Sequence, residues 1–202
     1  SIEVLRTYYI NKIVSLNPKR VGASFYTANR LFSEFFLEEL KLYMPDTEFL
    51  IGGPHIAPYE NNIDYYLSKS YIDVIVQGEG EIALAEYLKK ADDHSFKEPI
   101  NNITYKRNGE VIKGDYVANV IKLDAIPVPD YSDYDLGDYI NNSGFNIFAT
   151  RGCPNKCLFC SERNYFSNFK FRKAEVVYND IKELKKLYPH VRDFNFADSI
   201  SN

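Results

Sequence analysis

Residues 145–160 carry the stretch Phe-Asn-Ile-Phe-Ala-Thr-Arg-Gly-Cys-Pro-Asn-Lys-Cys-Leu-Phe-Cys, in which an apolar run ends in a cysteine-rich segment. The three cysteines of the chain, Cys153, Cys157 and Cys160, all fall in this stretch with the spacing C-x3-C-x2-C. The apolar run predicts a buried β-strand over 145–150, so the cysteines follow its carboxyl end. Three thiolates gathered on one loop can bind a soft metal centre.

A set of three sulfur ligands leaves such a centre incomplete. A cubane iron–sulfur cluster of an ordinary ferredoxin takes four cysteines, so three would leave one iron open. An open metal position distinguishes a reactive centre from a structural one. Two alternatives are a Cys3His zinc site that uses His55, His94 or His190, and three thiols that bind nothing. A disulfide framework is disfavoured, because three is an odd number and the spacing is too tight for a stapled secreted fold.

The composition indicates a globular chain without a nucleic-acid or membrane surface. With 202 residues and 45% hydrophobic residues, the chain can bury a core in one large or two small domains. The net charge is −4, with both signs interspersed, which indicates no nucleic-acid-binding face and no polybasic patch. No apolar run is long enough for a membrane span, and the N-terminus lacks a signal-peptide pattern. Clustered free thiols favour a cytoplasmic location.

Residues 1–92 alternate helical and strand patterns. Apolar spacing predicts helices over 2–16, 29–44, 61–70 and 81–90, and strands over 21–25, 48–51 and 73–76. Continuous apolar strands between amphipathic helices predict an α/β fold, a Rossmann-like doubly wound parallel sheet. Only one helical pattern precedes the first strand, so we expect a partial sheet and a chain that is a fragment.

The strand ends of this sheet are candidate ligand loops. Ligands of doubly wound sheets bind outside the carboxyl ends of the strands. Three strand ends carry small or turn-forming residues, and glycine lets backbone amides approach a bulky ligand closely. Ordinary loop glycines remain the alternative interpretation. The candidate residues are Ser24, Gly52, Gly53, Pro54, His55, Gly78, Glu79 and Gly80.

A hairpin and a linker separate this sheet from the cysteine segment. Asn108-Gly109 between two β-prone runs predicts a hairpin, and two spaced prolines that follow predict a stiff connector. We therefore place a hairpin and linker over 93–140, between domains at 1–92 and 141–202. In the last domain, strand 145–150, a helix over 173–188 and a strand over 193–198 form one βαβ unit. In barrels of such units the chemistry lies at the carboxyl ends of the strands.

The Arg-Gly before Cys153, the cysteine spacing and the aromatic residue before Cys160 resemble the radical S-adenosylmethionine (SAM) superfamily. The resemblance implies that the cysteines hold a [4Fe–4S] cluster, whose open iron is chelated by SAM. One electron from the cluster would then cleave SAM to a 5′-deoxyadenosyl radical. It also implies that Phe159 lies against the adenine of SAM and that Asp198, in a Phe-x-Asp pattern, faces the SAM site. The implied core is a partial TIM barrel, of which this chain holds the start.

The runs over 21–24, 52–55 and 76–81 resemble the cobalamin-binding domain that precedes many radical SAM cores. The similarity is to the branch of anaerobic magnesium-protoporphyrin cyclases and class B methyltransferases. It implies that the three loops hold the corrinoid and its nucleotide tail. The Asp-x-His-x-x-Gly motif, whose histidine binds cobalt in methionine-synthase-type domains, does not occur in the sequence. His55 is therefore not a cobalt ligand by motif position.

Together these resemblances imply a cobalamin-dependent radical SAM enzyme, of which this chain alone would be inactive. Methyl transfer and radical rearrangement or cyclisation are both compatible with that class. A small-molecule substrate and a one-electron reductant such as flavodoxin or ferredoxin are implied as partners. The alternatives are a radical SAM enzyme with a degenerate Rossmann-like docking domain that binds no cobalamin, and a zinc-stabilised structural protein.

Overall fold

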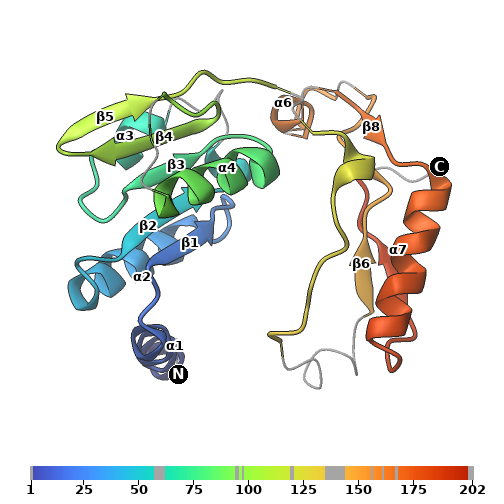
Figure 1. The fold of residues 1–202 in the computed structure, drawn as a ribbon, viewed down its shortest axis with the longest axis horizontal. Coiled ribbons are helices and arrows are strands. Elements are labelled where there is room, and N and C mark those ends of the chain that lie inside the picture. The colour runs from blue at the N-terminus through green and yellow to red at the C-terminus, as the bar shows by residue number, and fades with distance from the viewer. Residues whose placement is uncertain are drawn as a thin grey trace. The chain divides into compact units, whose positions relative to one another are not determined.

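Two units make up the chain, Ser1–Ala118 and Asn119–Asn202. They are called unit 1 and unit 2 below (Figure 1). The structure is a computed structural model that describes residues 2–56, 62–93, 96, 98–118, 121–134, 144–155, 157–160, 162–166 and 168–199. Among these residues, no helix combines the length and the apolar character needed to cross a membrane.

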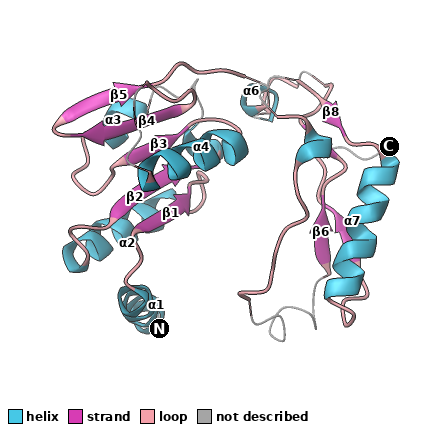
Figure 2. Ribbon diagram, viewed as in Figure 1, coloured by secondary structure: helices cyan, strands magenta, loops and turns pink. Residues whose placement is uncertain are grey.

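Unit 1 is built on a five-stranded sheet with the strand order β1-β2-β3-β4-β5. The first three strands are parallel and the last two are antiparallel: β1 (Arg20–Ser24), β2 (Glu48–Gly52), β3 (Val74–Val76), β4 (Ile103–Arg107) and β5 (Glu110–Lys113). Helices alternate with the strands, as Figure 2 shows: α1 (Ile2–Leu16), α2 (Arg30–Tyr43), the 3-10 turn η1 (Pro54–Ile56), α3 (Ile63–Leu67) and α4 (Gly80–Asp92).

The core of unit 1 lies on both faces of this sheet. In β2, Phe49 and Ile51 pack into one buried cluster, and Leu50 packs into the other. Successive strand side chains point to opposite faces, so a strand covered on both sides is apolar throughout. This confirms the predicted α/β sheet and explains why β2 and β3 show no alternation of apolar and polar residues.

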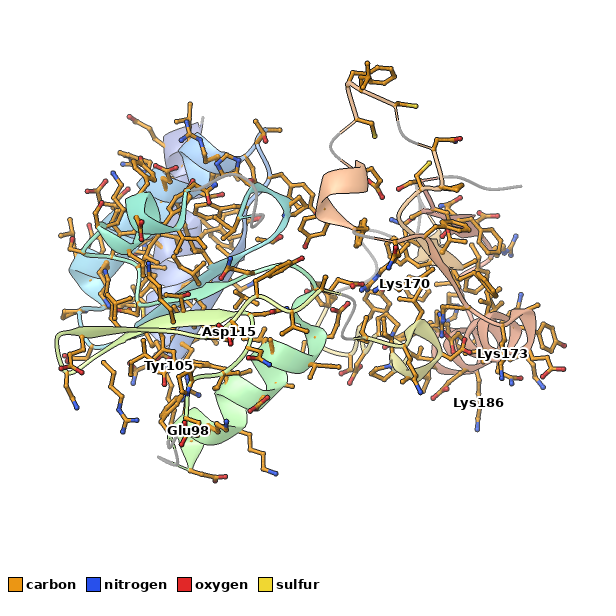
Figure 3. All side chains as sticks on the ribbon, turned by 90° about the horizontal axis from the view of Figure 1, so that it is seen from above. Glu98, Tyr105, Asp115, Lys170, Lys173 and Lys186 are labelled. Atoms are coloured by element: carbon orange, nitrogen blue, oxygen red, sulfur yellow. The ribbon has the colours of Figure 1, made fainter. Side chains whose placement is uncertain are left out.

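The hairpin lies in the sheet of unit 1. Asn108 and Gly109 have φ values of 52° and 81°, the left-handed pair that a two-residue hairpin turn requires. β4 pairs with β3 in the register Val76↔Ile103. Tyr105 of β4, labelled in Figure 3, is 2% exposed and packs against other aromatic rings of unit 1. The sequence analysis put this hairpin in the connection, because it could not show which sheet the strands join. The proposed division of the intact protein at 92 and 140 stays a prediction.

Unit 2 contains the predicted βαβ arrangement. β6 (Phe145–Ile147) pairs in parallel with β9 (Phe194–Phe196), and α7 (Ala174–Leu187) connects them. Val177 and Leu184 of α7 are buried in one cluster with Phe145 and Ile147. The predicted strand over 145–150 is interrupted, and the chain continues as β7 (Thr150–Arg151), which pairs antiparallel with β8 (Lys170–Phe171). The short α6 (Glu162–Tyr165) and the 3-10 turn η3 (Leu123–Ala125) complete the unit.

Among the described residues of unit 1, four tyrosines are buried, namely Tyr66, Tyr71, Tyr87 and Tyr105. Burial raises the pKa of Tyr71 to about 12, with the carboxylates of Glu34 and Glu38 adding to the shift. Burial also raises the pKa of Tyr66 and of Tyr87, whose hydroxyl groups donate hydrogen bonds to glutamate side chains. The folded state therefore holds these phenols in the protonated form.

The raised pKa of Tyr71 predicts a loss of stability at alkaline pH. An unfolded tyrosine ionises near pH 10, so this stabilisation is complete below about pH 10 and is lost as the pH rises toward about 12. Between about pH 10 and pH 12, each such tyrosine lowers the free energy of unfolding by roughly 1 kcal/mol per pH unit. Urea unfolding followed by circular dichroism measures this slope. Tyr71→Phe should make it shallower, and an unchanged slope would contradict the assignment.

Candidate metal centre and ligand loops

The three cysteines lie on the loop that follows β7. Cys153 and Cys160 are half-buried, Cys157 is exposed, and all three are free thiols. The amide of Cys160 donates a hydrogen bond to the carbonyl of Cys157 over 3.2 Å, so a turn joins the last two cysteines. Lys156, inside the same loop, lies outside the described residues.

Gly152 determines how the chain enters this loop. Its φ is 77°, a left-handed conformation that side chains rarely adopt. A Cβ at this position would lie 2.8 Å from the carbonyl oxygen of Asn168 and 3.1 Å from the Cβ of Phe166. The glycine before the first cysteine is therefore required by the backbone conformation and by the close approach of Phe166 and Asn168.

Leu158 and Phe159 form the apolar tip of the loop. Each is 94% exposed, although both side chains are large and apolar. Adjacent exposed apolar side chains mark a surface suited to a ligand or to further polypeptide. The contact of Phe159 with the adenine of SAM stays a prediction.

The donor set of the loop suits a soft metal centre. Three free thiols lie within eight residues, and one of them, Cys157, is exposed. Within the described part of the chain, no three His, Cys, Asp or Glu side chains converge as a metal site, with or without a histidine. His94, one of the zinc-ligand candidates, lies outside the described residues. The residue types thus fit a cluster, and the binding of one stays a prediction.

Asp198 follows β9 and contacts the entry to the cysteine loop. Its Oδ1 accepts hydrogen bonds from the amides of Ala149 over 3.0 Å and of Thr150 over 2.6 Å. The side chain is half-buried at the carboxyl end of β9. A role of Asp198 at the SAM site stays a prediction. Its contact with the backbone of Ala149 and Thr150 was not indicated by the sequence pattern.

Arg172 also forms hydrogen bonds with the backbone after β6, and it was not among the residues predicted from the sequence. Its amide donates to the carbonyl of Ala149 over 2.8 Å, and its Nη1 donates to the carbonyl of Phe148 over 3.3 Å. Its Nη2 pairs with Asp180 at 2.5 Å, and the side chain is 9% exposed. Arg172 lies between β8 and α7, outside the predicted helix, so no helical spacing linked it to Asp180 in the sequence.

In unit 1, the loops after β1 and β2 form one hydrogen-bonded edge. The amide of Phe25 donates to the carbonyl of Gly52 over 2.7 Å, and the amide of His55 donates to the carbonyl of Phe25 over 2.9 Å. Thr27 Oγ1 lies 3.4 Å from His55 Nδ1. The structure therefore brings Ser24, Gly52, Gly53, Pro54 and His55 together, as expected for the carboxyl edge of adjacent parallel strands.

The glycines of this edge are packed against the chain itself. A Cβ on Gly53, where φ is 94°, would lie 2.6 Å from Ser24 Oγ and 2.8 Å from the Phe25 amide nitrogen. A Cβ on Gly52 or Gly80 would contact Val76 at 3.3 or 3.1 Å. The space beside Gly53 is thus occupied by Ser24 and Phe25, and the space beside Gly52 and Gly80 by Val76 of β3. The close approach of these glycines to a ligand stays a prediction.

Tyr116 packs against the loop that follows β3, and it was not among the residues predicted from the sequence. Its ring lies 3.1 Å from where a Cβ on Gly78 would be, and burial together with Glu79 raises its pKa. The segment is anchored by Asn102, whose side chain exchanges hydrogen bonds of 2.9 and 2.6 Å with the backbone of Val117. Only the tertiary structure brings residues after the hairpin back to the Gly78–Glu79 turn.

Curated proteins of similar sequence include cyclases and methyltransferases. No family model matches the chain. Anaerobic magnesium-protoporphyrin IX monomethyl ester cyclases of Synechocystis sp. and Rubrivivax gelatinosus are 26% and 28% identical over 79% and 87% of this chain. The cobalamin-dependent radical SAM methyltransferase TokK of Streptomyces tokunonensis is 28% identical over 57%. The chain spans about a third of the length of the two cyclases, 32% of each, and 18% of TokK.

Solved structures show the same likeness. The cobalamin-dependent SAM radical enzyme OxsB matches with a TM-score of 0.69 and 18% identity, over 96% of this chain and 27% of its own. The radical SAM methyltransferase TsrM from Kitasatospora setae, with cobalamin and a [4Fe–4S] cluster bound, matches with a TM-score of 0.68 and 15% identity, over 94% of this chain and 39% of its own.

The chain is similar to cobalamin-dependent radical SAM enzymes. The likeness extends over both units, and it confirms the resemblance based on the cysteine motif and the glycine loops. At identities of 15–18%, similarity to cobalamin-dependent radical SAM structures shows the fold, and roles of individual residues stay predictions.

Gly53→Ala is expected to destabilise unit 1. The substitution places a Cβ against Ser24 and Phe25 in a left-handed conformation, and we expect a loss of roughly 1–3 kcal/mol. Gly22→Ala is the matched control, because nothing lies within 4 Å of a Cβ at that position in β1. Urea unfolding of both variants measures the difference, and equal stabilities would show that the loop relaxes around the new side chain.

Proposed function

We propose that the chain is the part of a cobalamin-dependent radical SAM enzyme that contains a cobalamin-binding sheet and the start of the SAM-cleaving barrel. The order of its parts carries the proposal. A mixed sheet, whose first three strands are parallel and carry the candidate loops, precedes a βαβ unit. The first strand of that unit continues through β7 into the C-x3-C-x2-C loop. The named relatives are cyclases and methyltransferases, so the intact protein would catalyse a radical reaction on a small molecule.

In unit 2, Cys153, Cys157 and Cys160 would hold three irons of a [4Fe–4S] cluster. When bound, such a cluster supplies the electron that cleaves SAM, which occupies the iron that the protein leaves open. Gly152 sets the direction of the loop, and Phe159 offers an exposed apolar face for the adenine of SAM. A cytoplasmic location and a flavodoxin or ferredoxin as reductant suit three free thiols and a reducible cluster.

In unit 1, the edge formed by Ser24, Gly52–His55 and Gly78–Gly80 would hold the nucleotide tail of cobalamin. His55 is half-buried, and its ring contacts that of Tyr66 in α3 edge-on, with 6.2 Å between the ring centroids. One observation favours a second candidate for this unit, a docking domain that binds no cobalamin. The glycines at its edge are accounted for by contacts within the chain.

Each of Cys153→Ala, Cys157→Ala and Cys160→Ala should prevent assembly of a stable cluster in the intact protein. A centre with three thiolates has none to spare, so we expect the iron content to fall from about four per chain to less than about one. Anaerobic reconstitution followed by iron and sulfide analysis and visible absorption measures this. The unsubstituted protein should also cleave SAM when reduced, and the variants should not.

Two outcomes would contradict the cluster. One is stoichiometric zinc without visible absorption in the unsubstituted protein, which would favour the structural zinc site. The other is reductive SAM cleavage that survives any one of the three substitutions.

Cobalamin binding can be tested at an exposed position of the proposed edge. Thr27 is exposed in the loop after β1, where a bulky side chain obstructs the edge without displacing a buried group. We expect Thr27→Trp to lower hydroxocobalamin affinity at least about tenfold, which corresponds to about 1.4 kcal/mol. Asp46→Trp is the control, because Asp46 is exposed just before β2, at the opposite edge of the sheet. Spectroscopic titration of the intact protein and of both variants measures the affinity. If none of the three bound hydroxocobalamin, the docking domain would be favoured.

A further inference from the structure

The backbone around Ala149 changes its pairing partner just before the cysteine loop. Up to Ile147 the chain pairs with β9, and the ladder ends where the amide of Ala197 donates to the carbonyl of Ile147 over 2.9 Å. From Thr150 onward it pairs instead with β8, in the register Thr150↔Phe171. The chain therefore leaves one sheet for another within three residues, and Cys153 follows directly.

At this change of partner, a side chain replaces a strand carbonyl as the hydrogen-bond acceptor. Where a β9 carbonyl would accept the next amide of a longer strand, Asp198 Oδ1 accepts the amides of both Ala149 and Thr150, over 3.0 and 2.6 Å. Hydrogen bonds to a carboxylate are shorter and stronger than those to a neutral carbonyl. Asp198 thus fixes the direction in which the chain departs from β6.

The residue after Asp198 holds the other end of the loop. The hydroxyl of Ser199 donates a hydrogen bond to the Oε1 of Glu162, the first residue of α6. The cysteine loop runs from β7 to α6, so its entry and its exit are tied to two consecutive residues at the end of β9. Arg172 braces the entry through the carbonyls of Phe148 and Ala149.

We propose that Asp198 and Ser199 form a clamp that sets the position of both ends of the cysteine loop before any cluster binds. Both are positioning residues, because they act on the thiols through the backbone and through Glu162. The clamp makes the metal site depend on β9 as well as on the cysteine segment. The link to cluster binding rests on the proposed function, whereas the restraint of the loop does not.

The test compares Asp198→Ala and Asp198→Asn with the control Asp193→Asn in the intact protein. Asp193 is an exposed carboxylate just before β9, at the opposite end of the same strand. Amide hydrogen exchange of the 147–152 peptide in the cluster-free protein reports the restraint without any metal. Iron and sulfide reconstitution, with the electron paramagnetic resonance spectrum of the reduced cluster, reports the arrangement of the thiols.

We expect Asp198→Ala to speed exchange of the Ala149 and Thr150 amides at least about tenfold. Because loss of outer partners lowers metal affinity about 10–100-fold, its cluster should also be retained more weakly and show a shifted spectrum. Asp198→Asn keeps an oxygen acceptor, so its amide exchange rates and cluster retention should lie between those of Asp198→Ala and those of the unsubstituted protein. Ser199→Ala should speed amide exchange near α6 and leave the amides of Ala149 and Thr150 protected.

The outcomes separate the clamp from the proposed function. Faster exchange in Asp198→Ala together with no cluster in any form would support the clamp and contradict the function. A cluster in the unsubstituted protein, with exchange and iron content in Asp198→Ala equal to those of Asp193→Asn, would overturn the clamp. Weaker SAM binding with unchanged exchange would overturn it as well, because Asp198 would then act on the cofactor directly. If Asp198→Ala does not fold, unchanged exchange in Asp198→Asn together with full cluster retention and an unshifted spectrum would overturn the clamp.

Discussion

Backbone amides that leave a sheet need an acceptor, and in unit 2 Asp198 supplies one. Its carboxylate binds the amides of Ala149 and Thr150 at the point where the chain passes from β6 to β7. A buried or half-buried N–H without an acceptor is costly, so this contact restrains the backbone strongly. Gly152 and the start of the cysteine loop follow within four residues of this restrained point.

The candidate ligand edge of unit 1 follows the same logic. The amide of Phe25 donates to the carbonyl of Gly52, and the carbonyl of Phe25 accepts from the amide of His55. Residues separated by 27 and 30 positions in sequence thus share backbone hydrogen bonds. The positive φ of Gly53 allows this close approach. These hydrogen bonds hold the two loops together without a ligand, and such preorganisation would lower the cost of binding one.

Much of the fold was predictable from local patterns. The alternation of apolar strands and amphipathic helices predicted β1 to β3, α2, α4 and α7, because burial on two faces or on one stripe leaves a clear period. Asn108-Gly109 predicted the hairpin through its turn geometry, but its membership of the sheet depends on contacts of β4 with β3 that no local pattern encodes. In α1, Tyr8 and Tyr9 are half-exposed and Ile10 is buried, since the buried face is chosen by the partner helix and sheet.

The sequence by itself determined the chemistry of the candidate site: three thiols at C-x3-C-x2-C spacing after a strand, and glycine at the turns of a parallel sheet. Residue type and short-range spacing are local properties, and they survive without knowledge of the fold. Only the tertiary structure decided what lies beside those residues. Asp198 reaches Thr150 across 48 positions, Tyr116 covers Gly78, and Ser24 fills the space beside Gly53. These contacts depend on strand register and on the path of loops, which arise from packing over the whole unit.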